Sequence, residues 1–204
     1  MENDVRVPTS LPMDAWLTAL ARPAGAPGGG AACGVILAVS AGLLHMVAAY
    51  TDDPRAEGCA DRLVRARTAA LETAEADGVR SADFGAALAL PSDDPARDER
   101  VRDAALSASR SSTDVGAIGS DLVPDLALLA EIGNPAVRAD LAIAAETLAT
   151  GLSGASINLR ADLQIARRHG ADGALCADLE QRGTSLDDDR ARVSVLAQSI
   201  LGGM

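Results

Sequence analysis

The sequence predicts an all-α protein, a bundle of long antiparallel helices that forms one domain over residues 1–204. Alanine and leucine dominate the chain and only three aromatic residues occur, which is a helix-forming composition. No stretch shows the persistent alternation of apolar and polar residues that is typical of strands. Connections between the helical stretches are short, so successive helices are expected to run antiparallel. A chain of 204 residues is long enough for one sizeable core.

Six helices are expected, each bounded by glycine, proline or a capping residue. They are placed at about residues 11–21 and 31–51, from Pro54 onwards, after Pro95, from Pro135 to His169, and at 186–201.

Two of these predicted helices contain glycine or proline residues, which often interrupt helices in proteins. We expect Asp77-Gly78 to break or bend the third helix. Gly116, Gly119 and Pro124 are expected to divide the fourth helix.

Residues 31–51 form an apolar run that is long enough to span a bilayer. The run is rich in alanine and glycine, contains His45, ends at Asp52-Asp53 and has no flanking basic cluster, all of which oppose a membrane span. Small residues such as Gly34 and Ala38 recur along it and would let a neighbouring helix approach closely. We therefore expect a buried central helix and no membrane role.

The charge of the chain excludes one large class of partners. There are 29 acidic residues against 18 basic ones, all of them arginine, so the formal net charge is −11. Such a surface repels a phosphate backbone, and nucleic acid is not expected as a partner. The N-terminus lacks the pattern of a secretory signal, and a cytoplasmic protein is expected.

The cysteines and histidines are too few and too scattered for a metal site or a disulfide framework. Cys33, Cys59 and Cys176 are odd in number and form no CxxC pair, and there are two histidines. We expect neither a metal nor a disulfide.

The first candidate site is the turn Pro27-Gly28-Gly29-Gly30, which directly precedes a predicted helix. Three glycines let the backbone turn sharply and leave helix N–H groups without partners, an arrangement that attracts anions. The same residues would also serve as a tight turn that allows close helix packing. Spacing alone leaves both interpretations open.

A second candidate is one face of the long fifth helix, which carries Asp140, Asn158 and Asp162 among small and apolar residues. Eighteen residues, about five turns, separate Asp140 from Asn158, so they share a face but lie about 27 Å apart. Asp140 and Asn158 would bind a ligand or, alternatively, have a structural role. In the structural role, Asp140 caps the helix or pairs with Arg138, and Asn158 forms a hydrogen bond across a helix interface.

A third candidate is the acidic cluster of Glu75, Asp77 and Asp83 around Arg80. Neighbouring carboxylates raise one another's pKa, which suits acid–base catalysis. Charge clusters of this kind are also common on solvated surfaces, and the residues alone favour that second interpretation.

Several short motifs occur together in one order along nearly the whole chain. These are Pro27-Gly28-Gly29-Gly30, the helix end His45-Met46-Val47-Ala48, Gly133-Asn134 with Asp140, and Asn158. In this order they resemble the cyclodeaminase/cyclohydrolase family, which includes formimidoyltetrahydrofolate cyclodeaminase domains and free-standing methenyltetrahydrofolate cyclohydrolases.

The resemblance implies a helical homodimer that binds a tetrahydrofolate derivative and needs no further cofactor. The implied reaction is hydrolysis of 5,10-methenyltetrahydrofolate to 10-formyltetrahydrofolate, or cyclisation of 5-formimidoyltetrahydrofolate with loss of ammonia. Asp77, fourteen positions before Pro91, is the implied catalytic residue. The implied substrate-binding residues are Pro27, Gly28, Gly29, Gly30, Asp140 and Asn158.

The chain departs from the family pattern at three positions near these residues. Ser81 stands where the family has an aromatic residue, and Ser112 and Ala117 stand where it has a proline and a glutamate. The alternative to an enzyme is therefore a folate-binding or structural helical dimer that has lost catalytic activity.

Overall fold

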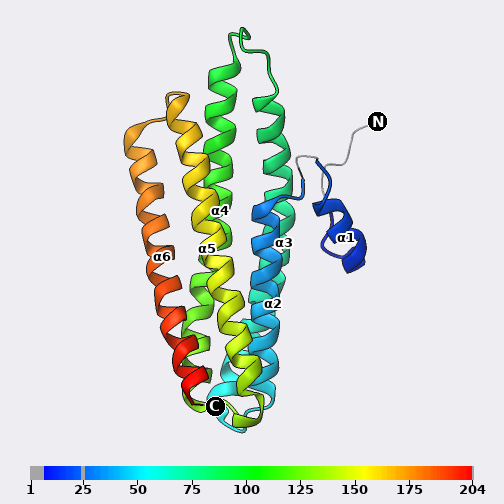
Figure 1. The fold of residues 1–204 in the computed structure, drawn as a ribbon, viewed down its shortest axis with the longest axis vertical. Helices are drawn as coiled ribbons and strands as arrows, with labels where there is room; N and C mark the ends of the chain where they lie inside the picture. The colour runs from blue at the N-terminus through cyan, green and yellow to red at the C-terminus, as the bar shows by residue number, and fades with distance from the viewer. Residues whose placement is uncertain (1–6, 24–25, 204) are drawn as a thin grey trace.

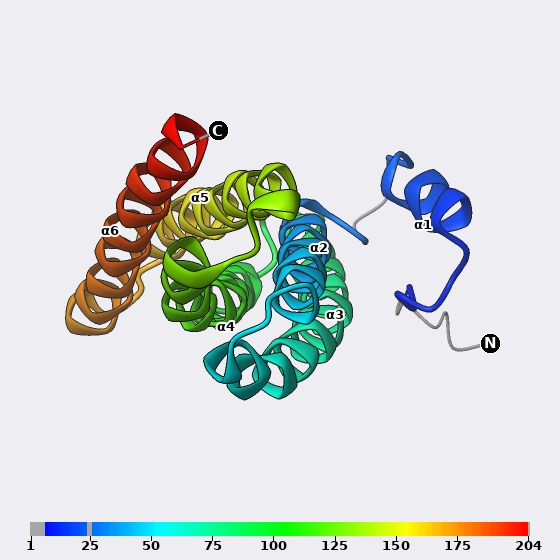
Figure 2. The same ribbon diagram turned by 90° about the horizontal axis from the view of Figure 1, so that it is seen from below.

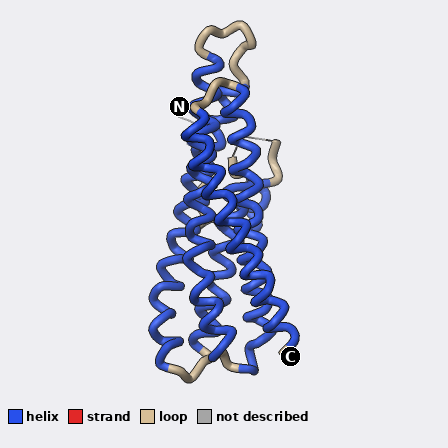
Figure 3. The backbone as a smooth tube through the Cα atoms, turned by 90° about the vertical axis from the view of Figure 1, so that its left-hand side faces the viewer, coloured by secondary structure: helices blue, strands red, loops and turns tan. Residues whose placement is uncertain are grey.

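The structure, a computed structural model, describes residues 7–23 and 26–203, and these residues form helices and no strands (Figures 1 and 3). The elements are α1 (Met13–Leu20), α2 (Gly29–Ala49), α3 (Pro54–Leu88), α4 (Arg97–Ile132), the 3₁₀ turn η1 (Pro135–Val137), α5 (Arg138–Arg168) and α6 (Gly173–Gly202).

Helices α2 to α6 lie side by side and alternate in direction, with their connections at the two ends of the bundle (Figures 1 and 3). The predicted all-α, antiparallel bundle is thus confirmed. Helix α2 packs against α3, α5 and α4, and α6 covers α5 and α4. Seen from below, α1 lies beside α2 and α3, outside the bundle (Figure 2). The buried Trp16 anchors α1 on Ala31 and Ala74.

Helix α2 is shorter than its neighbours, and this difference creates the environment of its first turn. It has 21 residues, whereas α3 has 35 and α4 has 36. At about 1.5 Å per residue, α2 spans about 32 Å and α3 about 53 Å. Because both meet at the lower end of the bundle, α2 begins part-way along α3 (Figure 1). Its first turn therefore faces the sides of longer helices.

Asp77-Gly78 was predicted to break or bend α3, and Gly116, Gly119 and Pro124 to divide α4; neither helix is broken. Helix α3 continues through Asp77-Gly78, and α4 continues through Gly116, Gly119 and Pro124. Packing explains the two α4 glycines, because a Cβ at Gly116 would lie 2.5 Å from Leu186 Cδ1 and one at Gly119 would lie 2.7 Å from Leu152 Cδ2. These glycines admit leucines from α6 and α5.

The last helix also begins earlier than predicted, at Gly173 in place of residue 186. Asp172 caps it by accepting a hydrogen bond of 2.9 Å from the Leu175 N–H. Gly183 lies within this helix, where an added Cβ would lie 3.2 Å from Leu159 Cδ2. Once again glycine marks a close helix contact and not an end.

Helix α2 is the one helix among the described residues that is long and apolar enough to cross a membrane. It lies within the bundle, as the core helix of a soluble protein does, with Leu37 and Leu44 fully buried. At Gly34 a Cβ would lie 2.9 Å from the Ala70 backbone oxygen, so α2 and α3 approach as closely as the small residues predicted. The expectation of a central helix is confirmed.

Candidate functional site

The first turn of α2 is capped by a side chain from another helix. Gly28 is the N-cap residue, has extended backbone angles and offers no capping side chain. The Asp77 carboxylate, from the middle of α3, accepts the backbone N–H of Ala31. A helix N-terminus favours a negative charge. Asp77 therefore occupies the position of the anion that the glycine turn was predicted to attract.

Gly30 is the residue that lets Asp77 approach. A Cβ added at position 30 would lie 2.6 Å from both Cγ and Oδ1 of Asp77. Distances below 3.0 Å do not occur for real Cβ atoms, so any side chain here would displace the carboxylate. The close approach of Asp77 requires glycine at this position.

Asp77 is almost fully buried, with 4% of its surface exposed. Ser111 Oγ of α4 donates a hydrogen bond of 2.9 Å to Oδ1, and Ser81 Oγ donates one of 3.3 Å to Oδ2. Burial raises the pKa of Asp77, while the bonds from Ser111, Ser81 and the Ala31 N–H, and the charge of Arg80, oppose that rise. The result is a buried carboxyl group with a raised pKa and several hydrogen-bond donors.

Helix α5 places an amide and a second carboxyl group at the same location. A Cβ at Gly29 would lie 3.6 Å from Asn158 Oδ1, so the Asn158 side chain lies beside the entrance of α2. Asp162 follows one turn later on the same face and is hydrogen-bonded to Ser112 of α4. Burial, and then the nearby charge of Asp77, raise the pKa of Asp162 to about 7, against the effect of the Ser112 bond.

This arrangement provides the groups that acid–base catalysis requires. Two carboxyl groups with raised pKa values, from α3 and α5, lie together with buried serine hydroxyls and an amide. A carboxyl group whose pKa lies near the working pH can both accept and release a proton. Four helices, α2 to α5, each contribute to the group.

The structure brings together most of the predicted site residues. Pro27 is buried, Gly28 to Gly30 form the entrance of α2, and Asp77 and Asn158 face that entrance. Asp140 lies in the first turn of α5, about 27 Å along the helix from Asn158, and is not part of this group.

The acidic cluster predicted around Arg80 separates in three dimensions. Arg80 pairs with Asp114 of α4 at 3.3 Å. Glu75 accepts hydrogen bonds of 2.8 and 2.9 Å from the backbone N–H and Oγ of Thr9. Asp83 is exposed. Of the three acidic residues, only Asp77 points into the bundle, because it alone lies on the α3 face that packs against α2 and α4.

Local sequence placed Asp162 on the candidate face of α5 but gave it no specific role, and it marked none of the serines Ser81, Ser111 and Ser112 as a site residue. Asp162 shares a helix face with Asn158, four residues earlier, and that spacing was the available signal. The serines carried no such signal, because their partners come from other helices. Ser81 and Ser112 stand at two positions where the chain departs from the family pattern, and both contact a carboxyl group of the site.

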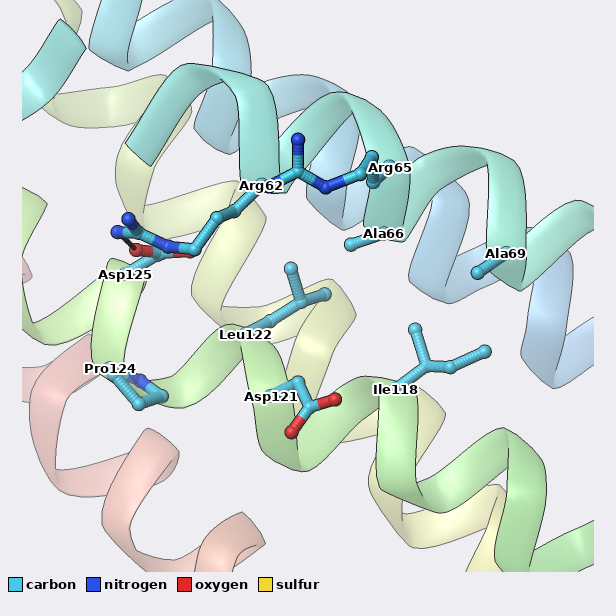
Figure 4. A pocket seen from close by; sticks show the side chains of 9 residues that line it. All are labelled: Arg62, Arg65, Ala66, Ala69, Ile118, Asp121, Leu122, Pro124 and Asp125. Carbon is cyan, nitrogen blue, oxygen red and sulfur yellow. Dashed lines mark hydrogen bonds and ion pairs between the residues drawn. The ribbon is translucent and has the colours of Figure 1, made fainter. Parts of the chain in front are cut away.

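A separate groove of about 580 Å³ lies between α3 and α4, away from Asp77 (Figure 4). Arg62 pairs there with the buried Asp125, and Arg65 and Asp121 line the same groove. Its two positive and two negative side chains balance, so the groove has no charge that would select an ionic ligand. It contains none of the predicted site residues.

The cysteines and histidines of the structure form no metal centre among the described residues. Over the residues that the structure describes, no group of three or more His, Cys, Asp or Glu side chains could hold a metal ion. The cysteines Cys33, Cys59 and Cys176 are buried free thiols. The negative charge of Asp77 adds to the effect of burial in raising the pKa of the Cys33 thiol.

Comparison with known proteins supports the resemblance. The family model described as formiminotransferase-cyclodeaminase matches residues 12–177. A crystal structure of formiminotetrahydrofolate cyclodeaminase from Thermotoga maritima superimposes with a TM-score of 0.78, covers 94% of each chain and is 21% identical in sequence. At this identity the structural match shows a common fold. A comparison with curated proteins finds no match.

Proposed function

Because this chain belongs to the formiminotransferase-cyclodeaminase family, we propose that it is an enzyme that acts on the one-carbon unit of a reduced folate. The reaction is hydrolysis of 5,10-methenyltetrahydrofolate to 10-formyltetrahydrofolate, or cyclisation of 5-formimidoyltetrahydrofolate with release of ammonia. Both reactions add a nucleophile to an amidine-type carbon and then expel a nitrogen. Both therefore need a group that takes up a proton.

The observation that carries this proposal is the position of Asp77. It is held by the first turn of α2 and two serines, and its pKa is raised by burial. A general base works best when its pKa approaches the working pH. In the hydrolysis, Asp77 takes a proton from the water that attacks the methenyl carbon. In the cyclisation, it takes the proton from N10 as that nitrogen attacks the formimidoyl carbon.

The other site residues position the folate. The Asn158 amide, beside Gly29, offers a donor and an acceptor to the polar edge of the pterin. Gly28 and Gly29 add no side chains of their own at the entrance of α2, so that a flat ring system can approach the backbone there. Asp140 stays a predicted ligand of a more distant part of the substrate. No cofactor other than the folate substrate takes part.

We also propose that the protein is a cytoplasmic homodimer. Two exposed isoleucines, Ile143 and Ile157, lie fourteen residues apart on one face of α5, which supports contact with a second copy. Light scattering coupled to size-exclusion chromatography tests this: a mass of two chains is expected, and a mass of one chain contradicts it.

The test of the proposed activity is a pair of turnover assays with purified protein. Loss of the methenyl chromophore reports hydrolysis, and release of ammonia from 5-formimidoyltetrahydrofolate reports cyclisation. We expect turnover in one assay and a loss of roughly 100- to 10,000-fold in Asp77→Asn, the usual range for a general base.

The matched control is Asp188→Asn, the same chemical change at an exposed position of α6. It should retain wild-type turnover. If wild type only matches the rate without enzyme in both assays, the enzyme proposal fails. Folate binding without turnover would then identify the alternative, a folate-binding protein that has lost activity.

A further inference from the structure

The two carboxyl groups of the site are held by neighbouring residues of one helix. Ser111 of α4 bonds to Asp77, and Ser112, the next residue, bonds to Asp162. Both serines are buried, with 0% and 2% of their surfaces exposed. Since each hydroxyl holds one carboxyl group, α4 fixes the two acids next to each other although they come from α3 and α5.

The charges around this pair favour protonation of one of its two carboxyl groups. Asp77 has one nearby cation, Arg80, which is also paired with Asp114. Among the residues that the structure describes, no cation shifts the pKa of Asp162, which is affected by burial, Asp77 and Ser112. On α2, the nearby titratable group is the Cys33 thiol, which burial and Asp77 keep protonated. Burial and the charge of Asp77 raise the pKa of Asp162 to about 7, so this carboxyl group holds its proton up to near-neutral pH.

The hydrogen bonds decide which member of the pair keeps the proton. Asp77 accepts three of them, from Ser111, Ser81 and the Ala31 N–H, and each stabilises its ionised form. Asp162 accepts one, from Ser112. The negative charge therefore resides on Asp77 and the proton on Asp162.

We propose that Asp162 is the second catalytic residue of this site, the acid that protonates the departing nitrogen, while Asp77 acts as the base. This inference rests on the proposed function.

The proton balance of the hydrolysis is complete with these two groups. Water adds its oxygen to the methenyl carbon, gives one proton to Asp77, and the π electrons of the C=N bond move to nitrogen. The bond from carbon to N5 then breaks, N5 keeps the electron pair and takes the proton of Asp162. The ionised Asp162 removes the proton of the carbinol oxygen as the formyl C=O forms, and Asp77 releases its proton to solvent.

The cyclisation uses the same two roles. N10 attacks the formimidoyl carbon and loses its proton to Asp77. The formimidoyl group reacts in its protonated form, –CH=NH2+, so the attack leaves a neutral NH2 group on the carbon. This nitrogen takes the proton of Asp162 and leaves as ammonia with the electron pair of the broken C–N bond, while the remaining nitrogen lone pairs form the methenyl cation. The proton on Asp77 is released to solvent and Asp162 takes up a proton again. A pair with one negative charge also suits the cationic methenyl group, which is the product here and the substrate of the hydrolysis.

The experiment compares Asp162→Asn, Ser112→Ala and the control Asp188→Asn with wild type, in turnover over a range of pH. We expect wild type to lose kcat at alkaline pH as Asp162 ionises. Asp162→Asn should lose roughly 100- to 10,000-fold in kcat and lack that alkaline decline. Ser112→Ala should keep most of its kcat and move the decline to higher pH, because the Ser112 bond favours the ionised form.

A second measurement needs no substrate. The infrared C=O stretch of a protonated carboxyl group, recorded at neutral pH, should be present in wild type and Asp188→Asn and absent in Asp162→Asn. Circular dichroism confirms that each variant is folded. If Asp162→Asn loses its fold, the pH shift in Ser112→Ala decides: an unshifted decline overturns the acid role.

The outcomes separate this inference from the proposed function. If wild type turns over and a folded Asp162→Asn keeps its kcat and pH profile, the acid role is overturned and the proposed function stands. If wild type shows no turnover in either assay, the proposed function fails and the acid role fails with it. In that case the infrared band still reports whether Asp162 is protonated.

Discussion

The Asp77 carboxyl group packs directly against Gly30: a Cβ at position 30 would lie 2.6 Å from its Cγ and Oδ1. The same carboxylate accepts the N–H of the next residue, Ala31. A contact between α2 and α3 thus both caps a helix and orients the proposed base.

Gly30→Ala should therefore reverse the usual effect of glycine replacement within a helix. Alanine normally stabilises a helix interior by about 0.5–1 kcal/mol relative to glycine. Here the methyl group would displace Asp77, and we expect a loss of about 1–3 kcal/mol in the free energy of unfolding. Turnover should also fall, because the base moves from its hydrogen bonds.

Gly42→Ala is the matched control, since it lies in the same helix and a Cβ there meets no atom within 4 Å. Urea unfolding of both variants checks the pair. The expected result is a stabilised Gly42→Ala and a destabilised Gly30→Ala. Equal stabilisation of both would show that Asp77 does not approach Gly30 in solution.

Gly34 tests the close packing of α2 on α3. A Cβ at this position would lie 2.8 Å from Ala74 Cβ and 2.9 Å from the Ala70 backbone oxygen, and a backbone atom cannot move aside as a flexible side chain can. We expect Gly34→Ala to destabilise the protein by about 1–3 kcal/mol. Gly58→Ala, in open space on α3, should lose no stability. A neutral Gly34→Ala in thermal unfolding would contradict this helix contact.

The raised pKa of Asp162 predicts how stability depends on pH. The ordinary value is 3.8 and the value in the folded protein is about 7, so the folded state binds the proton more tightly than the unfolded state. Its stabilising effect is complete below about pH 4 and is lost as the pH rises through about 7.

Asp162→Asn removes this titration. Its unfolding free energy should exceed that of wild type by roughly 1–3 kcal/mol at pH 8, and the difference should shrink towards pH 4. This range is smaller than the value obtained by converting the whole pKa shift at 1.36 kcal/mol per unit, because Asp162 is partly exposed and solvent screens its charge. Urea titrations at several pH values measure it. A pH-independent difference would refute the raised pKa.

The ion pair of Arg62 and Asp125, in the groove between α3 and α4, lies away from the proposed site, so its removal is expected to change stability only. The Asp125 side chain is 6% exposed and its partner Arg62 is 53% exposed. Arg62→Ala leaves a buried carboxylate without its cation, and we expect a loss of about 1–2 kcal/mol.

Arg65→Ala removes an exposed arginine from the same groove and should change stability by less than about 0.5 kcal/mol. Chemical denaturation of the two variants provides the comparison. Equal effects would mean that the pair of Arg62 and Asp125 does not form in solution.

Local sequence patterns were sufficient for the fold class. Helix-forming composition and short connections predicted the antiparallel bundle, and the small residues of α2 predicted its central place. The breaks that glycine and proline predicted at Asp77-Gly78, at Gly116 and Gly119, and at Pro124 do not occur in the structure. Whether a glycine ends a helix or admits a neighbouring side chain depends on contacts such as that with Leu186, which local sequence does not contain.

The residues of the site were likewise predicted only in part from the sequence. The order of short motifs along the chain led to the family, to Asp77 and to the residues from Pro27 to Gly30, and it left the family glutamate unmatched. Only the tertiary structure placed Ser112 and Asp162 beside Asp77, and Asp140 at the far end of α5. The reason is physical: a carboxyl pKa is set by burial, by neighbouring charge and by hydrogen bonds, and here these come from residues of α2, α3, α4 and α5, which are far apart in the sequence.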